Sequence, residues 1–409
     1  MAIKRVEFED FLVFGGKFGA DFCPGLNVLI GGNATGKSTL LRALYGFCFG
    51  FSEGAMDIGN IASAIDEAAG HVNPDELFPE VSAWIKEAEG NIRKSREDSA
   101  EESPEYDCDE IEELEGRLEG LEEEIRIWES CISDLFLDLF FKPGESGGRI
   151  YAGAHWNDFS DEPESGPYLA FTAESRHMGK CGARVFCDSY RDLAGRPTFI
   201  PVMDALSFSQ ITRLNDSYKK SLDLDPIVPE IIKQAGWLAP DAVPEKARGA
   251  LGELAGEIGG EVLAKEDGTF WVRKRSGKEI PYRMEAEGHK KLGLLWRLLR
   301  NDSIGSVLFW DEPESSINPE FASALADILL GLSRGGAQVF VATQSELLAG
   351  YFDANRAPGD EVLFTSLYRE GGAIKASSDT RFDWVSPNSL TDEPVRLYEK
   401  KLDRALGDV

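Results

Sequence analysis

The chain has 409 residues, of which 42% are hydrophobic and 28% are charged, a composition typical of a folded protein with roughly two or three domains. No apolar run reaches the roughly 18 residues that a membrane-spanning helix needs, and the N-terminus lacks the apolar core of a signal peptide. We therefore expect a cytoplasmic protein without a membrane partner. The net charge of −29 argues against a binder of bare duplex DNA, although a small basic groove remains compatible with it.

The N-terminal part of the chain contains a phosphate-binding pattern. Residues 3–11 and 26–30 are predicted strands, and the second leads directly into the glycines of GGNATGKS, which a helical pattern at 37–47 follows. This order of strand, loop and helix is the context that G-x-x-x-x-G-K-[ST] requires, with backbone N–H groups around the β-phosphate and the lysine at the β- and γ-phosphates. The predicted nucleotide-binding residues are Gly31, Gly32, Asn33, Ala34, Thr35, Gly36, Lys37, Ser38 and Thr39.

Residues 61–145 differ in character and form a predicted acidic helical insertion. Segment 86–130 alone holds 18 acidic and 6 basic residues. Apolar residues then alternate at spacings of three and four from 111 to 139, which is the pattern of a helical seam. Two interpretations stay open: one amphipathic helix packed on its own domain, or a helical hairpin or coiled coil between subunits.

The rest of the chain alternates between strands and helices. Strand-like runs occur within 148–201, and a hairpin with Asp267-Gly268 as its turn is predicted at 260–274. Buried strands are predicted at 306–310, 337–342 and 361–367. Helical patterns occupy most of 205–258, then 286–300 and 393–407. We therefore predict an α/β fold with a mixed sheet, an antiparallel β lobe and the helical insertion.

A second motif, SVLFWDEPESSINPE, places two carboxylates at the end of an apolar strand. At this position Asp311, together with the Ser38 hydroxyl, can hold Mg²⁺, and Glu312 can polarise an attacking water. Two surface acids at a strand end would not explain the four consecutive apolar residues before them. The pair therefore favours nucleotide hydrolysis over binding alone.

A third motif, AEGHKKLG, begins a helix 23 residues before Asp311. The N–H of Gly288 and the helix dipole can meet a phosphate, which need not belong to the same subunit. Taken alone this motif is weak, because a glycine before a helix is often only a cap. Its position between the other two motifs makes it informative.

In this order the three motifs resemble the ABC-type ATPase superfamily, and most closely its soluble branch with the RecF, SMC and OLD (overcoming lysogenization defect) families. LNVLIGGNATGKSTLLRAL is similar to that branch's opening, SVLFWDEPESSINPE to its Walker B motif and D-loop, and FIPVMDALS to a segment of OLD-like ATPases. The resemblance implies a P-loop NTPase head formed by 1–60 and 146–409, with a helical lobe at about 205–300. It also implies ATP and Mg²⁺ as cofactors, and a homodimer in which each ATP lies between one loop and the partner's signature helix.

Several positions depart from the family pattern. Ala286 stands where the signature has a serine, Gln344 where a switch histidine follows the strand, and Asn318 at a D-loop position. Glutamine donates a hydrogen bond but takes no positive charge. For the Q-loop glutamine, Asp204 and Gln210 are the candidates. These departures predict slow turnover, with Lys37, Asp311, Glu312 and Gln344 as the catalytic set.

Two groups of residues near these motifs leave alternatives open. His289, Lys290 and Lys291 flank the signature glycine and either supply positive charge across a dimer or form a solvated helix face. Phe11, Phe14 and Phe18 either stack on the adenine or, as phenylalanines do more often, pack in the core.

The resemblance favours a dimeric ATPase switch in defence against phage or foreign DNA. The residues after Ser345 are too few for the C-terminal Toprim nuclease of OLD proteins, so a nuclease or toxin effector would be a separate chain. The alternatives are a RecF- or SMC-like DNA-repair ATPase, which the acidic charge disfavours, and a non-hydrolysing nucleotide-binding regulator. A transporter subunit is the weakest alternative, because nothing indicates a membrane partner.

Overall fold

The computed structural model describes residues 3–49, 146–152, 168–175, 179–187, 196–210 and 225–407. The chain divides into two compact units, one formed by 1–45 with 195–409 and one by 46–194. The predicted acidic insertion at 61–145 lies outside the described residues, so the two interpretations of its heptad pattern stay predictions. Among the described helices, none combines the length and the apolar composition that crossing a bilayer requires.

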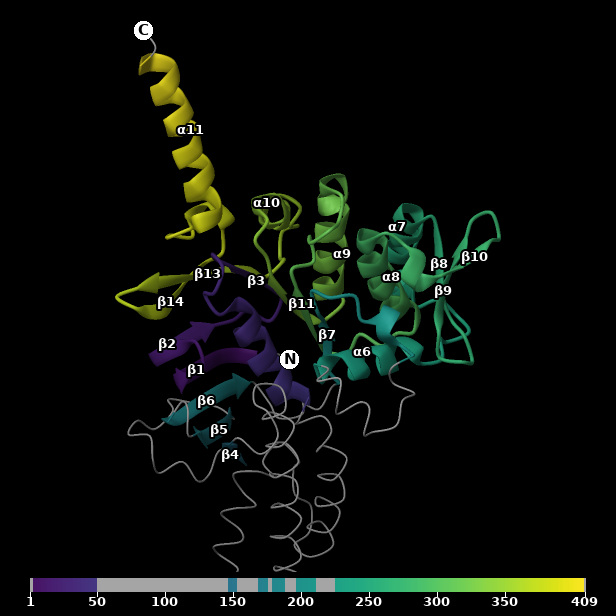
Figure 1. Ribbon diagram of the computed structural model, residues 1–409, viewed down its shortest axis with the longest axis horizontal. Coiled ribbons are helices and arrows are strands. Elements are labelled where there is room, and N and C mark those ends of the chain that lie inside the picture. The colour runs from purple at the N-terminus through teal and green to yellow at the C-terminus, as the bar shows by residue number, and fades with distance from the viewer. Residues whose placement is uncertain are drawn as a thin grey trace, which may run out of the picture. The chain divides into compact units, whose positions relative to one another are not determined.

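The first unit is built on a mixed sheet with the described strand order β14-β13-β3-β12-β11-β7 (Figure 1). β13 and β14 are antiparallel, and the other neighbouring strands are parallel. This arrangement confirms the predicted α/β fold with a mixed sheet. The strand bounds are β3 (Leu26–Ile30), β7 (Thr198–Ile200), β11 (Val307–Asp311), β12 (Gln338–Ala342), β13 (Val362–Glu370) and β14 (Ala373–Asp379).

The central strands are mostly apolar because both faces of the sheet are covered. Every residue of β3, β11 and β12 is buried. On one face, Trp310 shares a core cluster with α9 (Ala322–Arg334) and α10 (Glu346–Ala354). On the other face, Phe309 stacks on Phe340, and Tyr45, from the helix at 37–49, meets Phe309 edge-on. The sheet thus lies between two helical layers.

An N-terminal hairpin is attached to this sheet by hydrogen bonds from the Gln338 side chain, and its two strands are not members of the described six-stranded sheet. β1 (Ile3–Phe11) pairs antiparallel with β2 (Phe14–Asp21), a strand that the sequence analysis did not predict. The buried side chain of Gln338 bonds both the N–H and the carbonyl of Ile3, at 2.8 and 2.9 Å. Two amide contacts of this kind satisfy the polar groups that the junction buries.

The phenylalanines of the hairpin pack against each other. Phe8 lies 4.8 Å from Phe11, 4.9 Å from Phe14 and 5.8 Å from Phe18, measured between ring centroids. Phe11, Phe14 and Phe18 are all buried. Core packing is therefore their role, and the interpretation of these rings as an adenine platform is wrong.

The helical lobe surrounds α8 (Glu287–Arg300). α6 (Ile227–Gly236) and α7 (Arg248–Ile258) both contact α8. The buried Arg297 of α8 donates to the carbonyls of Ala235 and Trp237, at 2.8 and 3.0 Å, and so ties α8 to the end of α6. The lobe also contains a three-stranded antiparallel sheet in its described residues, of β8 (Gly260–Ala264), β9 (Phe270–Lys274) and β10 (Glu279–Pro281). Its first two strands form the predicted hairpin.

The remaining elements agree with the sequence prediction in part. In the second unit, β4 (Ser146–Ala152), β5 (Tyr168–Ser175) and β6 (Gly179–Cys187) form the predicted antiparallel lobe. The C-terminal helix α11 (Ser389–Gly407) begins four residues earlier than the pattern indicated. The short helix α10 was not predicted.

We predict that Phe11→Ala lowers the stability of the first unit by about 3–5 kcal/mol, because it removes a fully buried ring from the aromatic cluster. Val13→Ala, two residues away and 40% exposed, is the control and should change stability by less than about 0.5 kcal/mol. Urea unfolding followed by circular dichroism measures both. Equal midpoints for the two variants would contradict the core role of the cluster.

Candidate nucleotide-binding site

The pairing of three parallel strands sets the geometry of the site. β3 pairs with β12 so that Leu29 lies opposite Ala342, and β12 pairs with β11 so that Ala342 lies opposite Asp311. Parallel strands end at one edge of a sheet, where open α/β proteins bind their ligands. The loop after β3, Glu312 after β11 and Gln344 after β12 therefore begin side by side.

The loop after β3 holds its lysine inside the protein. The Lys37 ammonium donates to the carbonyls of Gly31 at 2.7 Å and of Gly32 at 2.9 Å, and the residue is buried. Burial lowers the pKa of Lys37, while the carboxylates of segment 311–314 act in the opposite direction. The lysine therefore lies between the phosphate loop and the acidic end of β11.

The conformation of the loop accounts for several of its other residues. Gly36 has a φ of 90°, and a Cβ added there would lie 2.6 Å from the ring of Phe14, so a side chain does not fit. The buried Thr35 hydroxyl donates to the Gly32 carbonyl at 2.9 Å. The other predicted loop residues are exposed or begin the helix: Asn33, Ala34, Ser38 and Thr39.

Asp311 is buried at the end of β11. Its side chain is hydrogen-bonded to Ser38, and its Oδ1 is buried without a hydrogen-bond partner. Burial raises the pKa of Asp311, and the bond to Ser38 acts against that shift. A hydroxyl and a carboxylate are ligands that Mg²⁺ accepts, and the unpartnered Oδ1 provides a ligand position. The two residues therefore fit the predicted magnesium site.

Glu312 is held in a strained conformation. Its φ is 46°, in the left-handed region that residues other than glycine seldom adopt. Its N–H donates to the Ala342 carbonyl at 2.8 Å, and its carboxylate accepts a hydrogen bond from the side-chain amide of Gln344. The residue predicted at the switch position thus contacts the predicted catalytic carboxylate directly.

Two supporting side chains were not predicted. Glu314 accepts a hydrogen bond from the Gln344 N–H at 2.8 Å, and its other oxygen is buried without a partner. Arg369, in β13, donates to the Ala34 carbonyl of the loop at 2.9 Å. The sequence could have indicated Glu314, because it is a third carboxylate shortly after Asp311. Arg369 had no local signal, because 335 residues separate it from Ala34.

The predicted signature glycine packs against its own chain. A Cβ added to Gly288, in the first turn of α8, would lie 2.4 Å from the carbonyl oxygen of Ser316. Only a glycine allows this approach between α8 and the turn that follows β11. Ala286 and Glu287 are exposed, so the N-terminal end of α8 is accessible to solvent.

Lys290 is buried and pairs with two carboxylates, of which Glu287 is exposed. Its Nζ lies 2.8 Å from a Glu287 oxygen and 3.3 Å from an Asp204 oxygen. Burial opposes the charged form of Lys290, but these two carboxylates outweigh it and raise its pKa. Asp204, one candidate for the Q-loop position, is therefore engaged by α8, whereas Gln210, the other candidate, is exposed.

The two other basic residues beside Gly288 are also engaged within the chain. The Lys291 ammonium is buried and donates to the backbone carbonyl of Glu312 at 2.8 Å. His289 Nδ1 lies 3.3 Å from a Glu285 oxygen. Neither a solvated helix face nor a cation reaching across a dimer describes Lys290 or Lys291.

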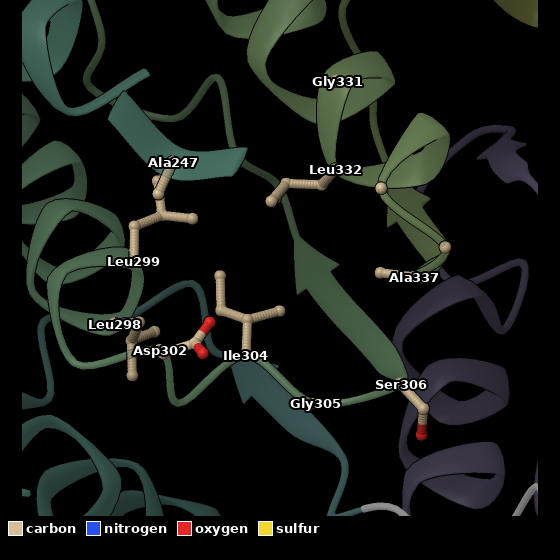
Figure 2. A pocket seen from close by; sticks show the side chains of 12 residues that line it. Ala247, Leu298, Leu299, Asp302, Ile304, Gly305, Ser306, Gly331, Leu332 and Ala337 are labelled. Atoms are coloured by element: carbon tan, nitrogen blue, oxygen red, sulfur yellow. The ribbon is translucent and has the colours of Figure 1, made fainter. Parts of the chain in front are cut away.

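A separate pocket of about 320 Å³ lies at the opposite edge of the sheet. Ser306 and Ala337, which line it, immediately precede β11 and β12, and Figure 2 shows Asp302, Ile304 and Leu332 around the same space. No predicted site residue lines it. The pocket is therefore not the nucleotide site.

Comparisons with solved structures find head domains of SMC proteins. Structural similarity extends to an SMC head bound to the C-winged helix domain of ScpA, with 12% identity, a TM-score of 0.44 and coverage of 93% of this chain and 98% of that one. The SMC head domain from Thermotoga maritima has 12% identity and a TM-score of 0.36, over 92% and 98%. The Pyrococcus furiosus Smc head with an extended coiled coil, bound to the C-terminal domain of ScpA, has 11% identity and a TM-score of 0.41, over 97% and 98%. No individually curated protein matches the sequence.

A comparison with protein families identifies the family of the chain. Residues 26–349 match the family described as AAA domain, putative AbiEii toxin, Type IV TA system. The match runs from the first residue of β3 to α10, so it includes the phosphate loop, the signature helix and the two carboxylates that β11 presents. The chain therefore belongs to this AAA-domain family of P-loop ATPases.

Proposed function

We propose that the protein binds and hydrolyses ATP with Mg²⁺ and acts as a nucleotide-driven switch. The observation that carries the proposal is the strand register that brings Asp311, Glu312 and Gln344 to the loop with Lys37 and Ser38. Lys37 would hold the β- and γ-phosphates. Bound Mg²⁺, held by Ser38 and Asp311, would neutralise charge that develops on the phosphate oxygens.

In the hydrolytic step, water attacks the γ-phosphorus, the bond to the β,γ-bridging oxygen breaks, and ADP and phosphate leave. Glu312 orients this water and accepts its proton. Gln344 donates to Oε1 of the Glu312 carboxylate, so Oε2 would accept the hydrogen bond from the water. A neutral amide adds no positive charge at the γ-phosphate. The missing charge favours slow turnover.

We propose further that two copies share each site. In such a dimer the exposed N-terminus of α8 would meet the γ-phosphate bound by the partner, with backbone N–H groups and the helix dipole as its attraction. Met284 lies just before α8 and is 71% exposed. In such a dimer this methionine would be covered by the partner.

The biological role that we favour is defence, with a separate toxin or nuclease chain as the effector. The family description, with its putative AbiEii toxin and type IV toxin–antitoxin system, supports this role over DNA repair. The net charge of −29 also disfavours the RecF- or SMC-like alternative, since a DNA-binding head needs a basic surface. The OLD-like subtype remains part of the proposal.

We predict that Glu312→Gln lowers the rate of phosphate release at least about 100-fold, because an amide accepts no proton from the attacking water. ATP affinity should be retained, since the Lys37 contacts are unchanged. Light scattering with no nucleotide, with ADP and with ATP plus Mg²⁺ should show a dimer that accumulates only with ATP. A wild-type protein that neither hydrolyses ATP nor dimerises would instead favour the non-hydrolysing regulator.

We also predict that Gly288→Ala lowers hydrolysis about tenfold or more, because the new methyl group forces α8 away from the Ser316 carbonyl and displaces the helix N-terminus. Binding of ATP to the phosphate loop should change little, and a fluorescent nucleotide measures it. The matched control is Gly252→Ala in α7, where an added Cβ meets no atom within 4 Å. This control should keep the rate and raise the unfolding free energy by about 0.4–1 kcal/mol. Equal rates for both variants would contradict a role for the N-terminus of α8.

A further inference from the structure

The Lys291 side chain connects the signature helix to the backbone of the predicted catalytic glutamate. Lys291 lies in the second turn of α8, and its Nζ donates to the Glu312 carbonyl oxygen at 2.8 Å. The residue is only 7% exposed. A buried ammonium is costly unless hydrogen bonds and opposite charges compensate it, so its position calls for a physical reason.

The charges that face Lys291 supply that compensation. Glu314, Glu312, Asp311 and Glu287 all favour its charged form, against a desolvation that lowers its pKa. The neighbouring Lys290 points elsewhere, to Glu287 and Asp204. Of the two lysines of α8, Lys291 is thus the one that interacts with the acidic end of β11.

The backbone of Glu312 needs support at this point. Its φ of 46° is strained, and such conformations persist only where the surroundings fix them. The N–H of Glu312 is held by Ala342 of β12, and its carbonyl is held by Lys291. Together these two bonds fix the peptide groups on both sides of the Glu312 Cα, and thereby the direction of its side chain.

We propose that Lys291 is a positioning residue for ATP hydrolysis, which holds Glu312 in its working conformation and couples that conformation to the position of α8. The proposal rests on the proposed function and deepens it. Gly288 and Lys291 lie on the same helix. If a partner's nucleotide displaces the N-terminus of this helix, Lys291 moves with it and shifts the Glu312 carbonyl to which it is bonded. Lys291 would act through Glu312 and not by contact with the nucleotide.

Replacement by methionine tests this role. Lys291→Met keeps most of the side-chain volume and removes the donor. Because removing one partner from a buried charge cluster leaves the opposite charges uncompensated, the melting temperature should fall. We expect phosphate release to fall about 10- to 100-fold, the loss that a small misplacement of a reacting group produces. ATP affinity should stay near wild type, and Lys291→Arg, which restores a cationic donor, should recover part of the rate.

The matched control is Lys274→Met. Lys274 also donates to a backbone carbonyl, that of Ile258 at 2.9 Å, and pairs with a carboxylate, that of Glu285 at 2.7 Å, but it lies in β9. Its replacement should leave the rate unchanged. A loss of rate in both variants, or a joint loss of affinity and melting temperature in Lys291→Met, would show a merely structural role and overturn the proposal.

A double-mutant cycle gives the second readout. Because Lys291 acts through Glu312, adding Lys291→Met to Glu312→Gln should lower the single-turnover rate no further, and Lys291→Met alone should accumulate the ATP-bound dimer. Additive losses would overturn the proposal. If wild type hydrolyses ATP and only Glu312→Gln abolishes it, the inference on Lys291 fails alone. If wild type shows no hydrolysis, the proposed function fails and the inference fails with it.

Discussion

The parallel register of β3, β12 and β11 is the constraint on which the rest of the site depends. It places Leu29, Ala342 and Asp311 at one level of the sheet, so the three segments that follow meet at one edge. Two hydrogen bonds continue the ladder beyond the strands, from the Glu312 N–H to Ala342 and from the Thr343 N–H to Leu29. A shift of one residue in any of these strands would turn each apolar side chain to the other face, and both faces are buried. Core packing therefore fixes the site geometry.

The site concentrates charge at a place where burial makes charge costly. Lys37 and Lys291 are buried cations, and Asp311 is a buried acid close to Glu312 and Glu314. Desolvation shifts the pKa of each of the first three toward its neutral form, and mutual attraction limits the shift. Two oxygens in this group, on Asp311 and Glu314, are buried without partners. A site with unpartnered acceptors and a strained Glu312 is arranged for a ligand more than for stability.

The packing of Gly288 on Ser316 and the bond from Lys291 to Glu312 have a common consequence. Both contacts join α8 to the segment after β11, one through backbone approach and one through a buried ammonium. The half of the site proposed to meet a partner's nucleotide and the half proposed to hydrolyse its own are thereby mechanically connected. A dimeric switch needs such a connection, because nucleotide state and partner engagement must change together.

The sequence by itself determined the elements whose signals are local. Short, mostly apolar runs predicted the central strands, the glycine pattern predicted the phosphate loop, and Asp311-Glu312 after an apolar run predicted the acidic strand end. These follow from strand burial and backbone conformation, which neighbouring residues set. The family match over residues 26–349 agrees with the order of these motifs.

Only the tertiary structure decided which side chains meet. Phe14 belongs to a strand that its glycines concealed, so its ring packs in the core instead of against a base. Lys291 looked equivalent to Lys290 in the sequence, yet the rotation of about 100° between consecutive helix residues directs one to Glu312 and the other to Asp204. Arg369 reaches the phosphate loop across 335 residues. Contacts of this kind depend on how distant segments pack, and a local pattern of residue types carries no information about the partner that each side chain finds.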